Sequence, residues 1–550
     1  MHRGSGGRST VTALVAVGLI LVAACSSGAK SATPSTARRA GGTLRLAMVG
    51  VDREPDPAEV VATDQSQMVL LDLLADGLTS IDPTTQQPVP ALATKWAADS
   101  AGTTWTFTLA DGVMFADGTA MTASSVVASL EHLAARPSSL AGARLDVVVG
   151  SREFAAGTAD HVVGLAAPDA QTVKITTTTP QADLPALLAS PLYGVAKLPE
   201  ADLADTTVTT GPDTSPARWT VGAGPFRVAS RAGDESRPST LVRSDGSDAQ
   251  LDEIDLVPVP DAAAGVRAVQ AGGADWSPAP AGTPASTSSG SGSASKVITS
   301  PLGAEEFFGM NLASPTFANQ QFRQAIVRAV DGSKVVAVGL PALVPSGGVV
   351  PPGVPGSSAD PCGDPCRYGP DQARYLLTQA FPDGQVPLVE VDTSDGVGDV
   401  AAADSVRDQL IAVGIPAEVK PLPFDQYQHF VTSGNQQLFR TGWVGLAPSA
   451  GAYLDPLFRS TSLDNLTAFN VADVDTGLAA AAAEPDTAKR QDRYAGLQQT
   501  ILGLSPVVPL GSYVSAVALS NALQGYAPRL DGTFVVEQVT VSGGATTTSR

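Results

Sequence analysis

The stretch Thr104-Trp-Thr-Phe-Thr-Leu-Ala-Asp-Gly-Val113 decides the fold class. Polar and apolar side chains alternate along its first half, which predicts a strand with one buried face. The dipeptides Asp111-Gly112 and Asp117-Gly118 then predict turns. Thr122 is a typical helix N-cap, and the apolar residues after it follow helical spacing to residue 135. The segment therefore predicts a strand, two turns and a helix in direct succession.

Strands and helices alternate along the rest of the chain as well. Strand-like segments lie at 41–47, 251–259, 307–312 and 388–391. Helical stripes of apolar residues lie at 68–78, 322–330, 373–380 and 406–413, and we expect Gly414 to be the C′ glycine of the last of them. This alternation predicts α/β domains with mixed sheets.

The N-terminus carries the signals of an exported lipoprotein. Basic residues come first, an apolar run follows to Ala24, and Leu21-Val-Ala-Ala-Cys25 ends it with a cysteine. This order is typical of a secretory signal peptide with a lipobox, which implies cleavage before Cys25 and a diacylglycerol on its sulfur. A spanning helix needs about 20 apolar residues, more than this run offers, and an uncleaved anchor or a chance cysteine are the alternatives. We expect a signal peptide at 1–24, a flexible tether at 25–40, and an extracytoplasmic protein anchored to the cell membrane.

Composition narrows the partners and the redox chemistry. The formal net charge of −20 argues against nucleic acid and against anionic lipid surfaces as binding partners.

Besides Cys25, the chain has only Cys362 and Cys366, and such a close pair in an exported protein usually forms a disulfide. A zinc site would need two further ligands, and the spacing is one residue too long for a Cys-x-x-Cys redox motif. We therefore predict a disulfide between Cys362 and Cys366.

Signatures of enzymes are missing from the sequence. It contains no G-x-S-x-G, no H-E-x-x-H, no Walker loop and no G-x-G-x-x-G. Histidine is rare; we expect His132 on the polar face of the helix at 122–135 and His429 as a packing residue. The sequence predicts no catalytic residue, no metal and no cofactor, although the acids of a hydrolase do not show in a single sequence.

Several segments together resemble the family 5 solute-binding proteins of ABC importers, the class that binds dipeptides and oligopeptides. They follow the family's order over residues 41–540. The segments are Gly41-Gly-Thr43, Asp56-Pro-Ala58, Pro90-Ala-Leu-Ala93 with Trp96, residues 104–126, Gly224-Pro-Phe226, Met310-Asn311, Phe322-Arg-Gln-Ala-Ile326, Val330-Asp331, Tyr368, Gly442-Trp443, Asn470, Val474-Asp475 and Pro509-Leu510. Two positions depart from the family pattern: Ala110 stands where arginine is usual, and Ser125 where aspartate is usual.

The resemblance implies a two-lobed α/β clamp of the periplasmic-binding-protein type, class II-like with mixed sheets, and an additional inserted domain. Lobe I would comprise residues 41–77, 217–298 and 500–541, the inserted domain II residues 78–216, and lobe III residues 299–499. Residues 542–550 would be a flexible tail, and the Ser/Gly-rich run 282–295 a surface loop near a crossover between lobes. Ligand in the cleft would shift the clamp from an open to a closed form.

The resemblance also implies substrate-binding residues in the cleft. Trp443 would cover a ligand side chain or peptide plane, with core packing as the alternative. Met310 and Asn311 lie on a cleft-facing strand, where the Asn311 amide either binds ligand backbone or holds the hinge. Asp56 either rims the pocket or caps its turn, and Tyr453 is a further candidate.

One segment departs from the peptide-binding members of the family. There it reads W-x-A-D-Y, and its aspartate binds the α-ammonium of the peptide. Here it reads Trp443-Val-Gly-Leu446-Ala447, so that Leu446 takes the place of the acid. This predicts a ligand without a free ammonium, or an ammonium bound by Asp455 or another acid.

The predicted function is the substrate-binding lipoprotein of an ABC importer. It would be a monomer without enzymatic activity, and it would deliver peptides or peptide-like solutes to permease subunits driven by an ATPase. The alternatives are a lipid-anchored hydrolase or ligand sensor on a similar clamp, and a family member for a non-peptide solute. A metal chelate as that solute is disfavoured because histidine is so rare.

Overall fold

The structure is a computed structural model that describes residues 41–51, 55–61, 64–198, 221–230, 239–286 and 295–542. The predicted signal peptide, Cys25 and the tether lie outside these residues, as do most of the run 282–295 and nearly all of the tail. Within the described ranges, no helix has the length and hydropathy needed to cross a bilayer. Residues Ala40–Arg550 form one compact unit, so the predicted boundaries between the lobes stay predictions.

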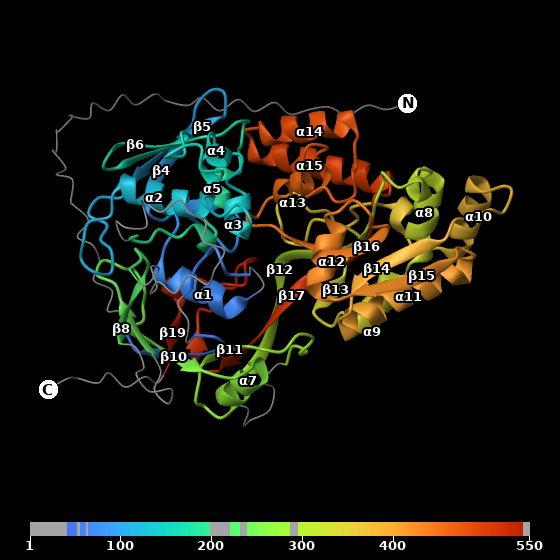
Figure 1. The fold of residues 1–550 in the computed structure, drawn as a ribbon. Coiled ribbons are helices and arrows are strands. Elements are labelled where there is room, and N and C mark those ends of the chain that lie inside the picture. The colour runs from blue at the N-terminus through green and yellow to red at the C-terminus, as the bar shows by residue number, and fades with distance from the viewer. Residues whose placement is uncertain are drawn as a thin grey trace, which may run out of the picture. The chain divides into compact units, whose positions relative to one another are not determined.

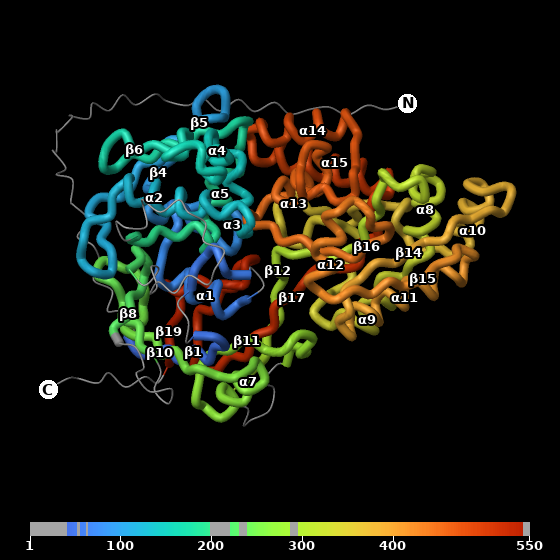
Figure 2. The backbone as a smooth tube through the Cα atoms, viewed as in Figure 1, coloured from blue at the N-terminus to red at the C-terminus, as the bar shows by residue number. Residues whose placement is uncertain are grey.

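Two long strands organise the fold. β12 (Ser295–Met310) and β17 (Val507–Ser520) pair antiparallel in the middle of an 11-stranded mixed sheet. Figures 1 and 2 show them side by side between the two halves of this sheet. The strand order is β15-β14-β16-β12-β17-β11-β1-β10-β9-β8, and β13 also pairs with β17. The register of β12 on β17 shifts between Pro301 and Glu305, so the pair is irregular where it passes from one half-sheet to the other.

The first half-sheet is built around β1 (Thr43–Met48). This strand pairs in parallel with β10 (Glu253–Pro258) and β11 (Trp276–Pro278), and β9 (Ser239–Arg243) and β8 (Phe226–Ser230) continue the sheet antiparallel. The remaining elements of this part are α1 (Gln65–Leu74), α7 (Ala262–Gln270), β18 (Leu523–Gln524) and β19 (Thr540–Val541). One face of α1 packs into this core and another into the core of the inserted domain. The strands predicted at 41–47 and 251–259 are confirmed.

The inserted domain has a sheet and a core of its own. Its four antiparallel strands are ordered β4 (Ala93–Ala98), β5 (Thr104–Leu109), β7 (Thr172–Thr176) and β6 (Leu165–Asp169). The hairpin of β2 (Thr79–Ile81) and β3 (Pro88–Pro90) precedes them, and the helices are α2 (Ala123–Ala134), α3 (Leu140–Ala143), α4 (Ser151–Ala155) and α5 (Leu184–Leu187). Phe107 of β5 and Leu130 of α2 are buried together. The strand and the helix predicted from 104–135 are both confirmed.

The second half-sheet carries most of the helices. Its strands are β13 (Leu343–Pro345), β14 (Val389–Ser394), β15 (Ala417–Leu422) and β16 (Leu438–Val444). One core beside it contains α8 (Gln320–Ala329), α9 (Gly332–Gly339), α10 (Pro370–Ala380) and α11 (Val397–Val413). A second core is formed by α13 (Gly451–Phe458), α14 (Ala472–Ala482) and α15 (Thr487–Gly503), and α12 (Phe424–Val431) packs separately. Gly414 ends α11 with a φ of 96°, as predicted.

Candidate functional site

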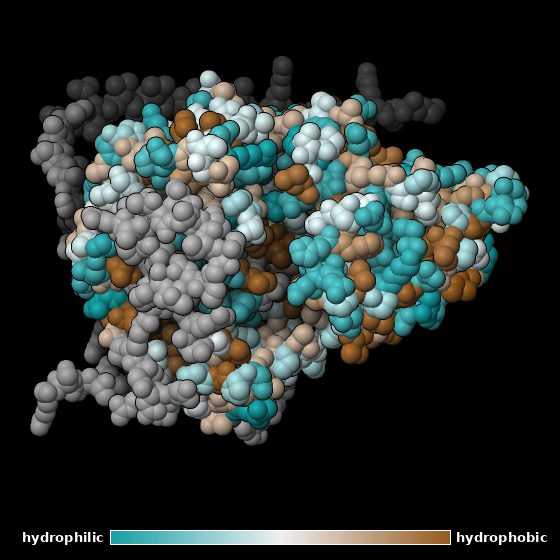
Figure 3. Space-filling view, in the orientation of Figure 1, coloured by the Kyte–Doolittle hydropathy of each residue, from teal (hydrophilic) through white to brown (hydrophobic). Residues whose placement is uncertain are grey.

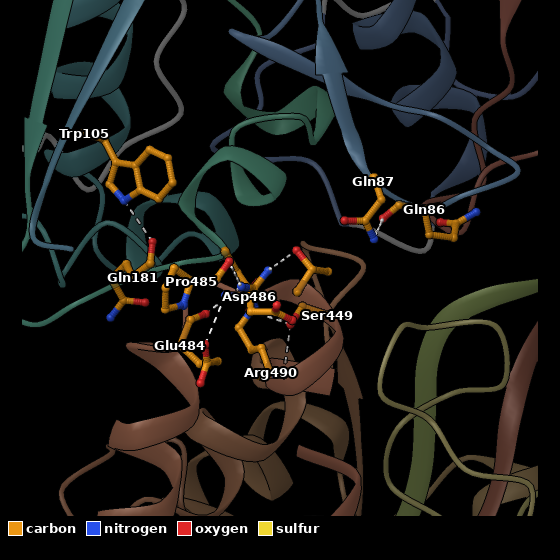
Figure 4. Close-up of polar contacts among 12 residues, drawn as sticks. Gln86, Gln87, Trp105, Gln181, Ser449, Glu484, Pro485, Asp486 and Arg490 are labelled. Atoms are coloured by element: carbon orange, nitrogen blue, oxygen red, sulfur yellow. Dashed lines mark hydrogen bonds and ion pairs between the residues drawn. The ribbon is translucent and has the colours of Figure 1, made fainter. Parts of the chain in front are cut away.

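A cavity of about 460 Å³ lies between the inserted domain and the helical layer α13–α15. We call it the cleft cavity. Its lining on the inserted-domain side comes from residues 86–88, 96–105 and 180–186, and on the other side from residues 355, 448–449 and 482–494. Figure 4 shows Trp105 and Gln181 on one side of Arg490, and Gln86 and Gln87 on the other. Figure 3 shows the surface in the orientation of Figure 1. The surface is hollowed between the part that carries α1 and the part that carries α12, and hydrophobic residues lie in the hollow.

Two tryptophans form an apolar wall of the cleft cavity. Trp96 and Trp105 stand on the neighbouring strands β4 and β5. Trp105 donates its indole N–H to the carbonyl of Gln181 at 3.0 Å, and both indoles pack against Phe107. The rings are therefore held in place, and both side chains are half-buried and border the cavity.

A polar cluster joins the two walls of the cleft cavity. Arg490 of α15 forms an ion pair with Asp183 of the inserted domain at 2.9 Å. Ser449 donates to the other oxygen of Asp183 at 2.5 Å, and the backbone N–H of Ala182 donates to the carbonyl of Ala482 at 3.0 Å. Arg490 also donates to the carbonyl of Glu484 at 2.8 Å. These contacts connect separate parts of the clamp, so they can hold it in a closed arrangement.

Two buried carboxyl groups lie where β12 passes between the half-sheets. Glu305 is fully buried, accepts a hydrogen bond from Ser512 at 2.6 Å, and burial raises its pKa to about 8. Burial also raises the pKa of Glu306 to about 7, against the opposing effect of Arg440, whose Nε lies 3.0 Å from the carboxylate. Tyr513 donates to Glu306 at 2.6 Å. Protonation of Glu305 and Glu306 is therefore coupled to the burial of these two side chains.

Trp443 lies at the end of β16, between the helical layer and the inserted domain. Its indole N–H donates to the carbonyl of Ala452 at 2.8 Å, and the guanidinium of Arg144 lies 4.5 Å from the ring centroid. Arg144 also pairs with Asp464 at 2.8 Å. Trp443 lines a cavity of about 80 Å³ next to Phe458. Trp443 is therefore packed against core residues and is also part of a cavity wall. A contact between Trp443 and ligand remains a proposal.

Leu446 and Tyr453 line a small cavity where several separate parts of the chain meet. This junction cavity has a volume of about 20 Å³ and is lined from the inserted domain, from Gly303 of β12, from residues 445–448 and from residues 529–531. Tyr453 of α13 is fully buried there. Leu446 packs against the core of the inserted domain, and Asp455 is engaged by Arg459.

The other predicted residues lie away from these cavities. Met310 is fully buried at the end of β12. The Asn311 amide donates to the carbonyls of Gly434 at 2.9 Å and Gln436 at 3.0 Å, which corresponds to the structural alternative. Asp56 accepts from the backbone N–H of Ala58 at 2.8 Å, as a turn cap does. A contact of these residues with ligand stays a prediction.

Two histidines are placed differently from expectation. His429 is exposed on α12, whereas the sequence predicted a packing residue. His132 is buried in α2, whereas the sequence predicted it on the polar face. Its ring lies 3.1 Å from the guanidinium of Arg136 and 4.0 Å from the carboxylate of Asp56. The turn around Asp56 covers this face, and helical spacing alone does not show such coverage.

The structure also places the two cysteines and the residues that could bind a metal ion. Cys362 and Cys366 form a disulfide in the structure. Among the residues that the structure describes, no group of three His, Cys, Asp or Glu side chains is placed to hold a metal ion. The polar residues of the cleft cavity, Gln86, Asp183, Ser449 and Arg490, were not found from the sequence. Trp96 and Trp105 were noticed as motif residues, but the alternation in the sequence shows only which face they share, not that it borders a cavity.

Comparison with known proteins explains this architecture. Residues 87–465 match the family of bacterial extracellular solute-binding proteins, family 5. The chain belongs to this family. The glutathione-binding protein GsiB of Salmonella paratyphi A is 26% identical over 452 residues, which cover 79% of this chain and 82% of GsiB. As a family 5 protein the chain is a solute-binding component of the ABC importer class, and the predicted family is confirmed.

Solved structures share the fold of this family 5 protein. The periplasmic murein tripeptide binding protein MppA, in an unliganded open form, matches with a TM-score of 0.73 and 21% identity over 91% of this chain and 97% of MppA. DppA from Helicobacter pylori, in complex with the peptide STSA, matches with a TM-score of 0.64 and 20% identity over 92% of this chain and 98% of DppA. The predicted two-lobed α/β clamp with mixed sheets is confirmed.

Proposed function

We propose that this family 5 protein captures peptides or peptide-like solutes in its cleft and delivers them to the permease of an ABC importer. The names of its relatives support peptide-like solutes, since GsiB is a glutathione-binding protein, MppA a murein tripeptide binding protein, and DppA was crystallised with a peptide. These relatives are binding proteins, which favours capture without chemical change. Delivery uses the energy of an ATPase in another subunit.

The observation that carries this proposal is the cleft cavity itself. It lies between two parts of the clamp, has two indoles on one wall, and offers carbonyl, carboxamide and hydroxyl groups on the others. Peptide ligands need both kinds of surface, because their side chains are largely apolar and every peptide unit carries a donor and an acceptor. The pair β12 and β17 crosses between the half-sheets and would act as the hinge.

Location and anchoring belong to the same proposal. Family 5 proteins are extracytoplasmic, and the lipobox ending at Cys25 would attach this one to the cell membrane through a lipid. The proposed capture takes place within one clamp and requires no second copy of the chain. We therefore propose a lipid-anchored monomer.

The test is a binding titration with two named probes, glutathione and the peptide STSA, followed by a panel of di- to pentapeptides. Trp96 and Trp105 supply a fluorescence signal in the cleft cavity. Trp105→Ala should weaken binding, and Val163→Ala, which removes an exposed side chain of the inserted domain, is the matched control. Peptide fragments accumulating during the titration would instead support the hydrolase alternative, and no binding by any member of the panel would reject peptides as the solute class.

A further inference from the structure

The junction cavity brings together parts of the chain that are far apart in sequence. The N–H of Gly303 donates to the carbonyl of Leu530 at 2.7 Å, and the N–H of Gly445 donates to the carbonyl of Gly303 at 3.0 Å. A Cβ on Gly445 would come within 2.4 Å of the Tyr453 ring. Glycine is therefore required at this position, and Tyr453 is pressed directly against the crossing backbones. The cavity is closed by contacts among three parts of the clamp.

Four polar atoms around this cavity lack a partner. They are Gln86 Oε1, Ser190 Oγ, Tyr453 Oη and Arg529 Nε, all buried and without a hydrogen bond to any part of the chain that the structure describes. Tyr453 is fully buried and Ser190 is 4% exposed. The N–H of Gly445 lies near the Tyr453 hydroxyl, but an N–H accepts no hydrogen bond and this one donates to the carbonyl of Gly303. Buried groups of this kind are rare, and four around one cavity indicate a missing partner that they share.

Gln86 is held in an unusual conformation at the entrance. Its φ of 55° is left-handed, which a residue with a side chain adopts only at a cost. The side-chain N–H of Gln86 donates to the carbonyl of Pro83 at 2.8 Å, which leaves Oε1 as the free acceptor. Gln86, Ala186 and Pro448 line both the junction cavity and the cleft cavity. The small cavity is thus an inner extension of the large one.

Size and charge define what fits. A cavity of about 20 Å³ accommodates one water-sized group, for which roughly 10–15 Å³ is the minimum. Arg529 is neutralised by Asp72 at 2.9 Å and donates to Ser80 at 3.1 Å, and Asp531 also lines the cavity. Arg529 is paired with Asp72, and Asp531 accepts from the Thr533 hydroxyl at 2.7 Å, so neither offers an unpaired charge to a ligand group. An uncharged group that can both accept, as from Arg529, and donate, as to Gln86, suits this mixed set of donors and acceptors.

We propose that the junction cavity is an inner subsite that holds one uncharged, hydroxyl-sized group, bound by Gln86, Ser190, Tyr453 and Arg529. The group is either an ordered water or a hydroxyl at the end of a ligand that lies in the cleft cavity. Only this second source rests on the proposed function. Because its partners come from three parts of the clamp, the bound group also links them to each other.

Removing the Tyr453 hydroxyl changes the melting temperature differently for a filled and for an empty cavity. In a filled cavity, Tyr453→Phe breaks a hydrogen bond and lowers the melting temperature about as much as Tyr427→Phe, a control that removes the buried hydroxyl donating to the carbonyl of Arg440. In an empty cavity, Tyr453→Phe removes a buried hydroxyl that lacks a partner, which leaves the melting temperature unchanged or raises it. Ser190→Ala should follow Tyr453→Phe. An unchanged or raised melting temperature for both variants overturns the proposal.

A high-resolution crystal structure of the ligand-free protein provides the second readout. We expect a density peak at hydrogen-bond distance from at least two of the four atoms, and its absence contradicts the proposal. Crystals with the peptide STSA separate the sources, since the peak either stays as water or is replaced by a peptide hydroxyl. If the peptide does not bind, only the proposed function is affected. The melting temperatures and the crystal structures are also measured in a double variant, Ala182→Cys with Ala482→Cys. A disulfide between these two positions is intended to lock the adjoining backbones and keep the junction closed.

Discussion

Glu305→Gln should make the stability of this protein less dependent on pH. Glu305 is fully buried at the crossing of β12, and burial raises its pKa to about 8 from its ordinary value of 4.5. The folded protein therefore keeps a proton on Glu305 at pH values where the unfolded chain has released it. The stability that this proton contributes is fully present below pH 4.5 and is lost as the pH rises through about 8. Glutamine resembles the protonated side chain and does not titrate.

The magnitude follows from this linkage. Between the two pKa values, wild-type stability falls by about 1.4 kcal/mol per pH unit relative to the variant. From pH 5.5 to pH 7.5 the free energy of unfolding of Glu305→Gln, minus that of wild type, should therefore increase by about 2–3 kcal/mol. Desolvation of a buried carboxylate is the physical cause.

Denaturant unfolding of both proteins at several pH values measures this difference. The control is Glu390→Gln, at a partly exposed ion pair with Lys420, and it should change stability by less than about 1 kcal/mol throughout. If the difference between Glu305→Gln and wild type is constant across this pH range, Glu305 is already ionised in the folded protein and the reasoning is refuted.

Three further predictions concern binding and anchoring. Trp443→Ala should weaken solute binding by roughly 1–3 kcal/mol if the indole contacts ligand, whereas a melting temperature that falls with unchanged affinity would assign it to core packing. N-acetylation of a bound peptide should change its affinity little, because Leu446 offers no charge to an α-ammonium; a loss greater than about a hundredfold, near 2.7 kcal/mol, would show that another acid binds it. Cys25→Ser should block lipidation and shift the protein out of the detergent phase, and partitioning equal to wild type would contradict the lipobox.

Local patterns predicted the local structure well. The alternation from Thr104 to Leu109 and the glycine at 414 each depend on a few neighbouring residues, and β5 and the end of α11 follow them. β12 was predicted only at 307–312, but it begins at Ser295. Its first half mixes polar and apolar residues and is partly exposed, and it is a strand because β17, distant in the sequence, pairs with it.

The candidate site was harder to predict for the same reason. Asp183 and Arg490 meet across the cleft cavity from two separate parts of the chain, and neither stands in a recognisable motif. The surroundings of Trp443 depend on Arg144 of the inserted domain, so the sequence left open whether it packs or binds. The family resemblance named segments near the cleft, but contacts between segments decide which side chains line a cavity.

The central claim is that this protein carries a peptide or peptide-like solute without altering it. Native mass spectrometry of protein purified from its natural host, without denaturation, tests this most directly. We predict a bound adduct which, when released and sequenced by fragmentation, contains peptide bonds and rebinds unchanged. A released adduct without peptide bonds, or one that the protein cleaves on rebinding, would contradict the claim.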